Sequence, residues 1–149
     1  ELRSHLNMIL GLDTQHKIGI VGAGNLGMAL ANYKGFEPRY FQVAALFDKK
    51  ASRLGITSLS GVFVYHIKDL KAIVARENIV IGVVAVPAEN APEVVDRLTE
   101  TGITAILNFA PVRLSTKPEI KLKTMDLAIS FESLSYFLSN SLLAAQDPS

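Results

Sequence analysis

The chain has 149 residues, of which 49% are hydrophobic and 19% charged, with a formal net charge of +1 and no cysteine. This composition is typical of one α/β domain; it excludes disulfides, thiolate metal sites and cysteine nucleophiles, and it argues against a broad basic face that grips nucleic acid. No apolar run approaches the ~20 residues that span a bilayer and no signal peptide is visible, so we expect a cytoplasmic chain without a membrane partner.

Residues 1–13 predict a short amphipathic helix that ends at Gly11, because Leu2, Leu6, Ile9 and Leu10 fall on one helical stripe. The chain begins at Glu1 and not at a methionine. The helix is therefore either an ordinary N-terminal helix or the end of a segment that lies upstream. Its pattern alone favours neither interpretation.

Strand and helix candidates alternate along the rest of the chain. Strands are expected over residues 17–22, 42–48, 62–66, 78–86, 103–109 and 124–131. Helices are expected over residues 25–32, 67–76 and 89–101. Residues 110–123, with two prolines, predict a long polar connection. The alternation predicts an α/β fold with a doubly wound parallel sheet and right-handed crossovers.

Residues 22–27, "GAGNLG", match the pattern G-x-G-x-x-G between the first strand and the first helix. Gly22 allows the tight turn, Gly24 lets a diphosphate approach the backbone, and Gly27 lets the helix lie close to the strand. The helix start adds free N–H groups and the positive end of the helix dipole. The turn therefore predicts a Rossmann-type dinucleotide site. Its expected contact residues are Gly22, Ala23, Gly24, Asn25, Leu26 and Gly27.

Asp48 ends the second expected strand, at about the spacing of 20 residues past the turn that is usual for the ribose-binding carboxylate. A carboxylate there accepts hydrogen bonds from the ribose hydroxyls and repels a 2′-phosphate, which favours NAD(H) over NADP. Lys49 and Lys50 follow directly, and two cations could tolerate a phosphate, so NADP remains an alternative. Lys49 is itself an expected cofactor contact.

The residues that a dehydrogenase needs beside its substrate are missing. None of the histidines, His5, His16 and His66, has a carboxylate partner on a plausible catalytic loop, and no Ser-Tyr-Lys spacing of the reductase type occurs. We therefore expect no catalytic residue and no metal site. A cofactor site without this chemistry indicates that the nucleotide is a signal and not a reagent.

Residues 130–146 predict a C-terminal helix with several large apolar side chains, among them Leu134, Phe137 and Leu138. Such residues at the end of a compact α/β chain need a surface to cover. They could pack on their own sheet or on a second copy of the chain.

Over nearly its whole length the sequence resembles the family of redox-sensing transcriptional repressors called Rex. The resemblance is carried by "KIGIVGAGNLGMALANYKGF", "VAALFDKK", "VPAENAPEVVDRLTETGITAILNFAPVRL" and "MDLAISFESLSYFL", and "AILNFAP" is more specific than the glycine turn. It implies a cytoplasmic homodimer that compares NADH with NAD⁺ and releases operator DNA when NADH binds.

The resemblance also implies how the chain is divided. Residues 1–13 resemble the linker after an N-terminal winged-helix DNA-binding domain that is missing here. Residues 14–131 resemble the Rossmann NAD(H)-binding domain, and residues 132–149 resemble a C-terminal dimerisation helix and tail, swapped onto the partner subunit.

Further roles follow from the resemblance alone. The stretches "VPAEN" and "NFAP" would end two strands and flank the nicotinamide half of the cofactor. The residues concerned are Val86, Pro87, Asn108, Phe109 and Ala110. Tyr33 and Asp126 match a switch pair that meets across the dimer interface in one redox state. Leu127 stands where family members can carry an aromatic residue that packs on nicotinamide, and leucine excludes water without stacking.

Two other classes of protein remain open. A nucleotide-binding subunit of a CoA ligase has a similar glycine turn and "VPA" loop, but it carries a phosphorylatable histidine. A small dehydrogenase fragment is disfavoured by the missing base.

Overall fold

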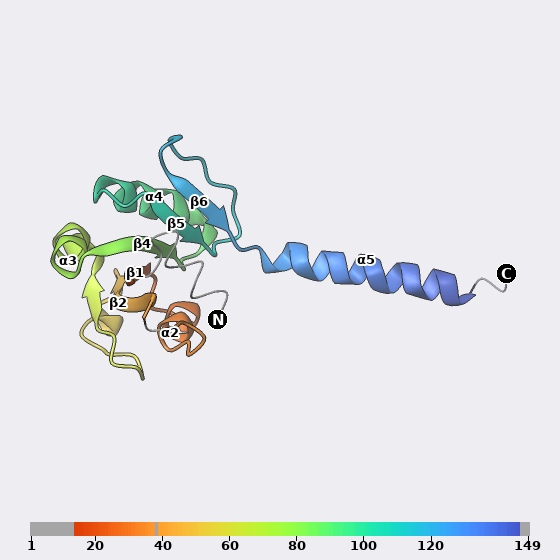
Figure 1. The fold of residues 1–149 in the computed structure, drawn as a ribbon, viewed down its shortest axis with the longest axis horizontal. Helices are drawn as coiled ribbons and strands as arrows, with labels where there is room; N and C mark the ends of the chain where they lie inside the picture. The colour runs from red at the N-terminus through yellow and green to blue at the C-terminus, as the bar shows by residue number, and fades with distance from the viewer. Residues whose placement is uncertain (1–13, 38, 147–149) are drawn as a thin grey trace.

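The computed structural model describes residues 14–37 and 39–146, with side chains up to residue 143, so the helix expected over residues 1–13 lies outside the described residues. Six parallel strands form one sheet in the order β3-β2-β1-β4-β5-β6 (Figure 1). The strands are β1 (His16–Val21), β2 (Phe41–Asp48), β3 (Val64–His66), β4 (Ile79–Val84), β5 (Ala105–Asn108) and β6 (Lys121–Thr124). The helices are α2 (Asn25–Ala31), α3 (Leu70–Glu77), α4 (Ala91–Glu100) and α5 (Leu127–Gln146), with short 3₁₀ turns η1 (Ala51–Arg53), η2 (Ile67–Asp69) and η3 (Ala88–Asn90). The predicted doubly wound parallel α/β sheet is confirmed.

The strand order reverses between β1 and β4. Strand β1 pairs with β2 on one side and with β4 on the other. The chain leaves β1 through α2 toward β2, and the crossover after β3 returns to the opposite side of β1. Connections that diverge in this way leave a crevice at the carboxyl ends of the strands, which is where open α/β sheets bind ligands.

Two hydrophobic clusters cover the two faces of the sheet. Because side chains alternate along a strand, Ile20 of β1 belongs to the cluster under α2, while its neighbour Val21 belongs to the cluster under α3 and α4. In the same way Leu46 faces α2 and Phe47 faces the opposite layer, and both are fully buried. Strands covered on both faces have the nearly continuous apolar sequence from which they were predicted.

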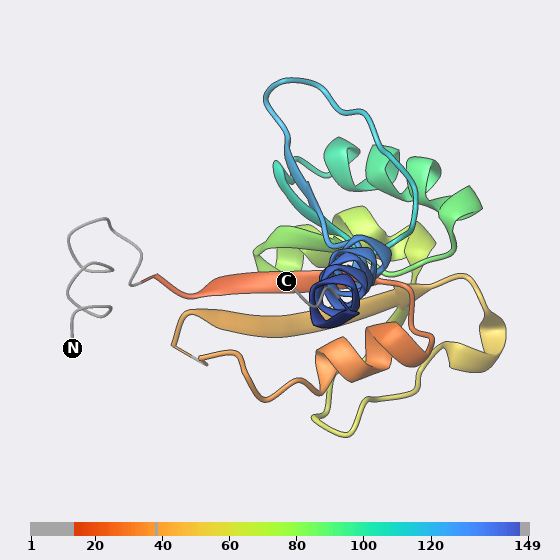
Figure 2. The same cartoon turned by 90° about the vertical axis from the view of Figure 1, so that its right-hand side faces the viewer.

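The two faces are not equally covered. Helices α3 and α4 pack on one face, whereas α2 alone packs on the other, over β1 and β2 (Figure 2). Beside α2 a groove remains open, which we call the apolar groove because every residue along it is apolar or aromatic. Its lining residues are Ile18, Ile20, Leu30, Tyr33, Phe36, Phe41, Val43, Ile81, Val83, Leu107, Phe109 and Met125.

The strand expected over residues 124–131 is wrong. Strand β6 lies earlier, and three of its four residues belong to the segment expected to be a polar connection, while α5 already begins at Leu127. In β6, Leu122 packs against the core while its neighbouring lysines are exposed, so one inward residue is enough for an edge strand. Asp126 then starts the helix, since its Oδ1 accepts a hydrogen bond from the amide of Ala128 at 2.9 Å, as an N-cap does.

Helix α5 leaves the α/β body as a single rod (Figure 1). All of its described side chains are exposed, including Phe131 at 68% and Phe137 at 64%. At 3.6 residues per turn, most of its large apolar residues form two stripes on opposite sides. One stripe holds Leu127, Phe131, Leu134, Leu138 and Leu142, the other holds Ile129, Tyr136 and Leu143, and Phe137 lies between them. A helix of this composition requires partners on more than one side.

Candidate functional site

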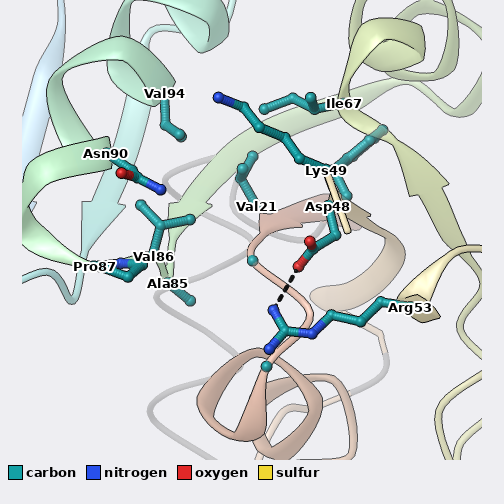
Figure 3. Close-up of a pocket in the computed structure, with 13 residues that line it drawn as sticks. Val21, Asp48, Lys49, Arg53, Ile67, Ala85, Val86, Pro87, Asn90 and Val94 are labelled. Carbon is teal, nitrogen blue, oxygen red and sulfur yellow. Dashed lines mark hydrogen bonds and ion pairs between the residues drawn. The ribbon is translucent and has the colours of Figure 1, made fainter. Parts of the chain in front are cut away.

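A crevice opens at the carboxyl ends of β1, β2 and β4, where the strand order reverses (Figure 3). The glycine turn forms its floor, the end of β2 with η1 forms one wall, and the segment between β4 and α4 forms the other. The lining residues are Val21, Gly22, Gly24, Phe47, Asp48, Lys49, Arg53, Ile67, Ala85, Val86, Pro87, Asn90 and Val94.

The glycine turn has the geometry that its sequence predicts. Gly22 has a φ of 111°, which L side chains rarely adopt, and a Cβ there would collide with the carbonyl oxygen of Ala85. A Cβ on Gly27 would collide with the carbonyl oxygen of Gly22, so α2 can follow β1 this closely only with glycine at that position. A Cβ on Gly24 would meet no atom closer than 3.6 Å, and it would project toward the guanidinium of Arg53. Gly24 therefore leaves open space on the crevice side of the turn.

Asp48 holds the crevice together from the end of β2. Its carboxylate is 9% exposed and accepts three hydrogen bonds, from the amide of Ala23 at 2.8 Å, the amide of Lys50 at 2.8 Å and Nη1 of Arg53 at 3.0 Å. Burial raises the pKa of this carboxyl, but the two amides and the guanidinium together outweigh burial and hold the pKa below its usual value. Asp48 is therefore an anion at neutral pH.

A surface ion pair spans the crevice between its two walls. Nζ of Lys49 lies 3.3 Å from Oε2 of Glu93 in the first turn of α4, and Nε of Arg97 lies 3.3 Å from the other oxygen of the same carboxylate. The hydrogen bonds from Lys49 and Arg97 lower the pKa of Glu93. The charge of Lys49 is thus partly matched by Glu93 and not by Asp48.

The crevice includes some of the residues predicted from the sequence and not others. Gly22, Gly24, Asp48, Lys49, Val86 and Pro87 line it. Ala23 lies beneath it and binds Asp48 through its amide, and Asn25, Leu26 and Gly27 form the first turn of α2 beside it. Asn90, at the end of the expected stretch "VPAEN", also lines it. Sequence reasoning missed the other lining residues, which are Val21, Phe47, Arg53, Ile67, Ala85 and Val94. A cation five residues past Asp48, in a turn that follows β2 directly, was the signal that could have identified Arg53.

The three residues predicted at the end of β5 do not line the crevice. Asn108 is fully buried, and its side chain bonds the amide and carbonyl of Ala110, the carbonyl of Val112 and the hydroxyl of Thr124. Its amide group thereby joins the loop after β5 to the end of β6. Ala110 is buried in the core, and Phe109 lines the apolar groove.

The expected switch residues lie away from the crevice. Tyr33, after the end of α2, is 58% exposed and lines the apolar groove, where its ring meets Phe36 edge-on with centroids 5.0 Å apart. Asp126 caps α5, and Leu127 is the first residue of that helix. Leu134, Phe137 and Leu138 lie on its exposed surface.

The two described histidines do not line the crevice. Nδ1 of His66 accepts a hydrogen bond from the amide of Lys68, and the His16 ring lies beside Phe41. Within residues 14–37 and 39–146, no group of three or more acidic, histidine or cysteine side chains is placed to hold a metal ion. In the same part of the chain, no helix has the length and apolar character needed to cross a membrane.

Known proteins resemble this chain over most of its length. A family model described as "CoA binding domain" matches residues 13–112. The redox-sensing transcriptional repressor Rex of Natranaerobius thermophilus is 44% identical over 141 residues, which are 95% of this chain and 64% of the relative. The chain likewise spans 64% of the Rex proteins of Desulfitobacterium hafniense and Pelotomaculum thermopropionicum.

Solved structures agree with these relatives. RSP, a Rex-family repressor, has been crystallised with β-NADH. The sequence in that structure is 36% identical to this chain, and the two folds superpose with a TM-score of 0.86. The match covers 97% of this chain and 70% of RSP. The structure of RSP with β-NAD⁺ and operator DNA is also 36% identical with a TM-score of 0.86, over 97% of this chain and 66% of RSP.

Proposed function

Because the chain belongs to the Rex family of redox-sensing transcriptional repressors, we propose that it is the NADH/NAD⁺-sensing core of such a repressor and not an enzyme. The observation that carries this proposal is the Asp48 carboxylate, which lies at the end of β2 beside Gly22 and Gly24 inside the crevice. A carboxylate in this position receives the ribose hydroxyls of a dinucleotide. The β-NADH and β-NAD⁺ complexes of RSP, which has the same fold, support the choice of cofactor.

The crevice fits a dinucleotide because Gly24 leaves open the space that a side chain would fill. We assign the diphosphate to the turn at residues 22–27 and the adenosine ribose to Asp48 and Lys49. We assign the nicotinamide half to Val86 and Pro87 after β4. The neighbouring stretch of Asn108, Phe109 and Ala110 contributes to that half through the loop that it anchors.

The Asp48 carboxylate itself favours NAD(H) over NADP. The carboxylate is ionised and would repel a 2′-phosphate. Lys49 is engaged with Glu93 on the opposite wall, so it does not offset that repulsion directly.

We also propose a homodimer in which α5 of each subunit lies in the apolar groove of the other. The groove is lined only by apolar and aromatic residues, and α5 carries an exposed stripe that includes Leu134 and Leu138. Two surfaces of matching character on one chain can close a symmetric pair, in which each copy covers the other. We propose that in such a pair Tyr33, which lines the groove, meets Asp126 at the start of α5 of the other subunit.

The redox response follows from charge. Nicotinamide is positively charged when oxidised and neutral when reduced. A two-state dimer responds only if its states bind the two forms with different affinity, and a shift from 1:99 to 99:1 needs about 5.5 kcal/mol of differential binding. We propose that Leu127 excludes water near the ring, and that the Tyr33–Asp126 contact forms in one state of the dimer only.

Binding to operator DNA belongs, in this proposal, to an N-terminal winged-helix domain that lies outside the chain. The chain has a net charge of only +1 and spans 64% of its Rex relatives. In the full-length protein, NADH binding would change the angle between subunits and release the operator.

Calorimetric titration of the chain with NADH, NAD⁺ and CoA tests the proposed function. We expect tight binding of NADH, weaker binding of NAD⁺ and no response to CoA. Binding of CoA alone would favour the CoA-ligase class, which shares the glycine turn. Turnover of a small metabolite with NADH would contradict a purely sensory role.

A further inference from the structure

Arg53 is the cation aimed at the glycine turn. Its Nη1 lies 3.0 Å from Oδ2 of Asp48. Its Nη1, Nη2 and Cζ also lie 3.6, 3.6 and 3.7 Å from the point where a Cβ on Gly24 would be. Figure 3 shows the guanidinium between the carboxylate and the turn. One side chain thus contacts the ribose-binding carboxylate and lies over the space that Gly24 leaves open.

The other basic residues near the crevice are directed elsewhere. Lys49 reaches across to Glu93, and Lys50 meets Asp48 through its backbone amide. Among the residues that line the crevice, Lys49 and Arg53 are the only lysine or arginine side chains. Arg53 is therefore the lining cation that faces the turn.

A carboxylate has about four acceptor sites, so Asp48 cannot accept both hydroxyls of a ribose and keep its three present donors. Its carboxylate accepts hydrogen bonds from Ala23, Lys50 and Arg53. The first two donors are backbone amides fixed by the turn and by the end of β2. The third is the end of a flexible side chain that is 37% exposed. Arg53 is the donor that can leave without rearranging the fold.

We propose that Arg53 releases Asp48 and binds the diphosphate when a dinucleotide enters the crevice. A guanidinium presents parallel N–H donors that match phosphate oxygens, and the open space at Gly24 is where the turn admits a diphosphate. The ribose hydroxyls then take the place of Arg53 on Asp48. This inference rests on the proposed function, since it assigns a further binding residue to the same site.

In this arrangement Arg53 affects how tightly the cofactor binds and does not affect whether NADH or NAD⁺ is preferred. NADH and NAD⁺ share the diphosphate, so Arg53 contributes equally to the binding of both. ADP carries the same diphosphate and ribose without nicotinamide. Loss of Arg53 therefore weakens all three ligands by a similar factor and leaves the ratio of NADH to NAD⁺ affinity unchanged.

The test measures dissociation constants for ADP, NADH and NAD⁺ by calorimetry on the whole chain and on Arg53→Gln, Arg53→Lys and Arg39→Gln. Arg39→Gln removes the same charge at an exposed position outside the crevice. We expect Arg53→Gln to weaken each ligand about tenfold, the loss of one charge-assisted hydrogen bond. Arg53→Lys should retain most of the affinity, and Arg39→Gln all of it. Thermal unfolding verifies that each variant is folded.

A second comparison separates direct contact from an effect through Asp48. In an Asp48→Asn background, Arg53→Gln should still weaken ADP about tenfold, because the diphosphate contact does not need the carboxylate. Disappearance of the loss in that background, or unchanged ADP binding by Arg53→Gln alone, overturns the inference. If the parent chain binds ADP but neither NADH nor NAD⁺, the proposed function fails while the role of Arg53 is still decided by ADP.

Discussion

The amide of Ala23 donates a 2.8 Å hydrogen bond to Oδ2 of Asp48, and this bond ties the glycine turn after β1 to the end of β2. The residues are 25 positions apart in the chain. The same carboxylate that we propose to bind a ribose therefore also joins the floor of the crevice to one of its walls. Substitutions at Asp48 should affect both stability and binding.

Asp48→Asn should reduce the free energy of unfolding by about 1–3 kcal/mol at pH 7, because an amide cannot accept all the donors that a buried carboxylate accepts. The folded pKa of Asp48 lies below the value of about 3.9 in unfolded chains. The ionised form thus stabilises the fold above that pH, and the stabilisation is lost as the pH falls through the lowered pKa. Urea unfolding from pH 7 to 3 should show the difference between parent and variant shrinking below about pH 4.

Asp69→Asn is a matched control, since Asp69 is exposed and its side chain makes no cap hydrogen bond. It should change neither stability nor NADH binding. A constant stability difference between the parent and Asp48→Asn across this pH range would contradict the assigned role of the ionised carboxylate.

Gly27→Ala should mainly reduce the stability of the fold, whereas Gly24→Ala should mainly reduce the affinity for NADH. A Cβ on Gly27 collides with the backbone of Gly22, so this variant should lose about 1–3 kcal/mol of stability or more. The three atoms nearest to a Cβ on Gly24 belong to the guanidinium of Arg53 and lie at ordinary contact distances, so this variant should lose no more than about 1 kcal/mol while its NADH affinity falls sharply. Chemical unfolding and calorimetry distinguish the two. Full NADH affinity in folded Gly24→Ala would place the diphosphate elsewhere.

Leu138→Asp should convert the proposed dimer to a monomer. The side chain is 60% exposed in the single chain and lies on the stripe assigned to the apolar groove, where a carboxylate would be buried without a partner. Ser139→Asp adds the same charge to an exposed position of the same helix between its two apolar stripes and should leave the dimer intact. Sedimentation equilibrium measures both. A monomeric parent chain, or a dimeric Leu138→Asp variant, would count against the exchange of α5.

Asp126 has two expected roles, as the N-cap of α5 and as the partner of Tyr33 in a second copy, and two substitutions can distinguish them. Asn caps helices about as well as Asp, whereas Ala does not, so Asp126→Ala should cost about 1 kcal/mol of helix stability and Asp126→Asn little. If the carboxylate also contacts Tyr33 of a second copy in one redox state, Asp126→Asn and Asp126→Ala should both alter the ratio of NADH to NAD⁺ affinity. A ratio that is unchanged in Asp126→Asn would leave Asp126 as a helix cap alone.

Asn108→Ala should destabilise the domain by about 2 kcal/mol, because the buried side chain bonds backbone groups of the loop after β5. NADH affinity, measured by calorimetry at a temperature where the variant is folded, should fall several-fold, roughly the loss of one hydrogen bond, because the loop that Asn108 anchors is assigned to the nicotinamide half. Unchanged NADH affinity in the folded variant would remove this loop from the proposed site.

Much of this molecule could be predicted from short stretches of its sequence. The alternation of apolar strands and helices predicted the parallel sheet, and the spacing of Gly22, Gly24 and Asp48 predicted which loops form the crevice. These features are local: a backbone turn, a strand period and a short offset are each determined by neighbouring residues. The resemblance of longer stretches indicated the family.

Only the tertiary structure decided how side chains meet. The sequence did not show that Arg53 donates a hydrogen bond to Asp48 or that the Asn108 side chain bonds its own loop. It also did not show that the last strand is Lys121–Thr124 and not the segment 124–131. It also left open whether α5 covers its own sheet, whereas the fold leaves that helix exposed and a groove open beside α2. Such contacts depend on the packing of elements that are distant in the chain, which local residue patterns do not encode.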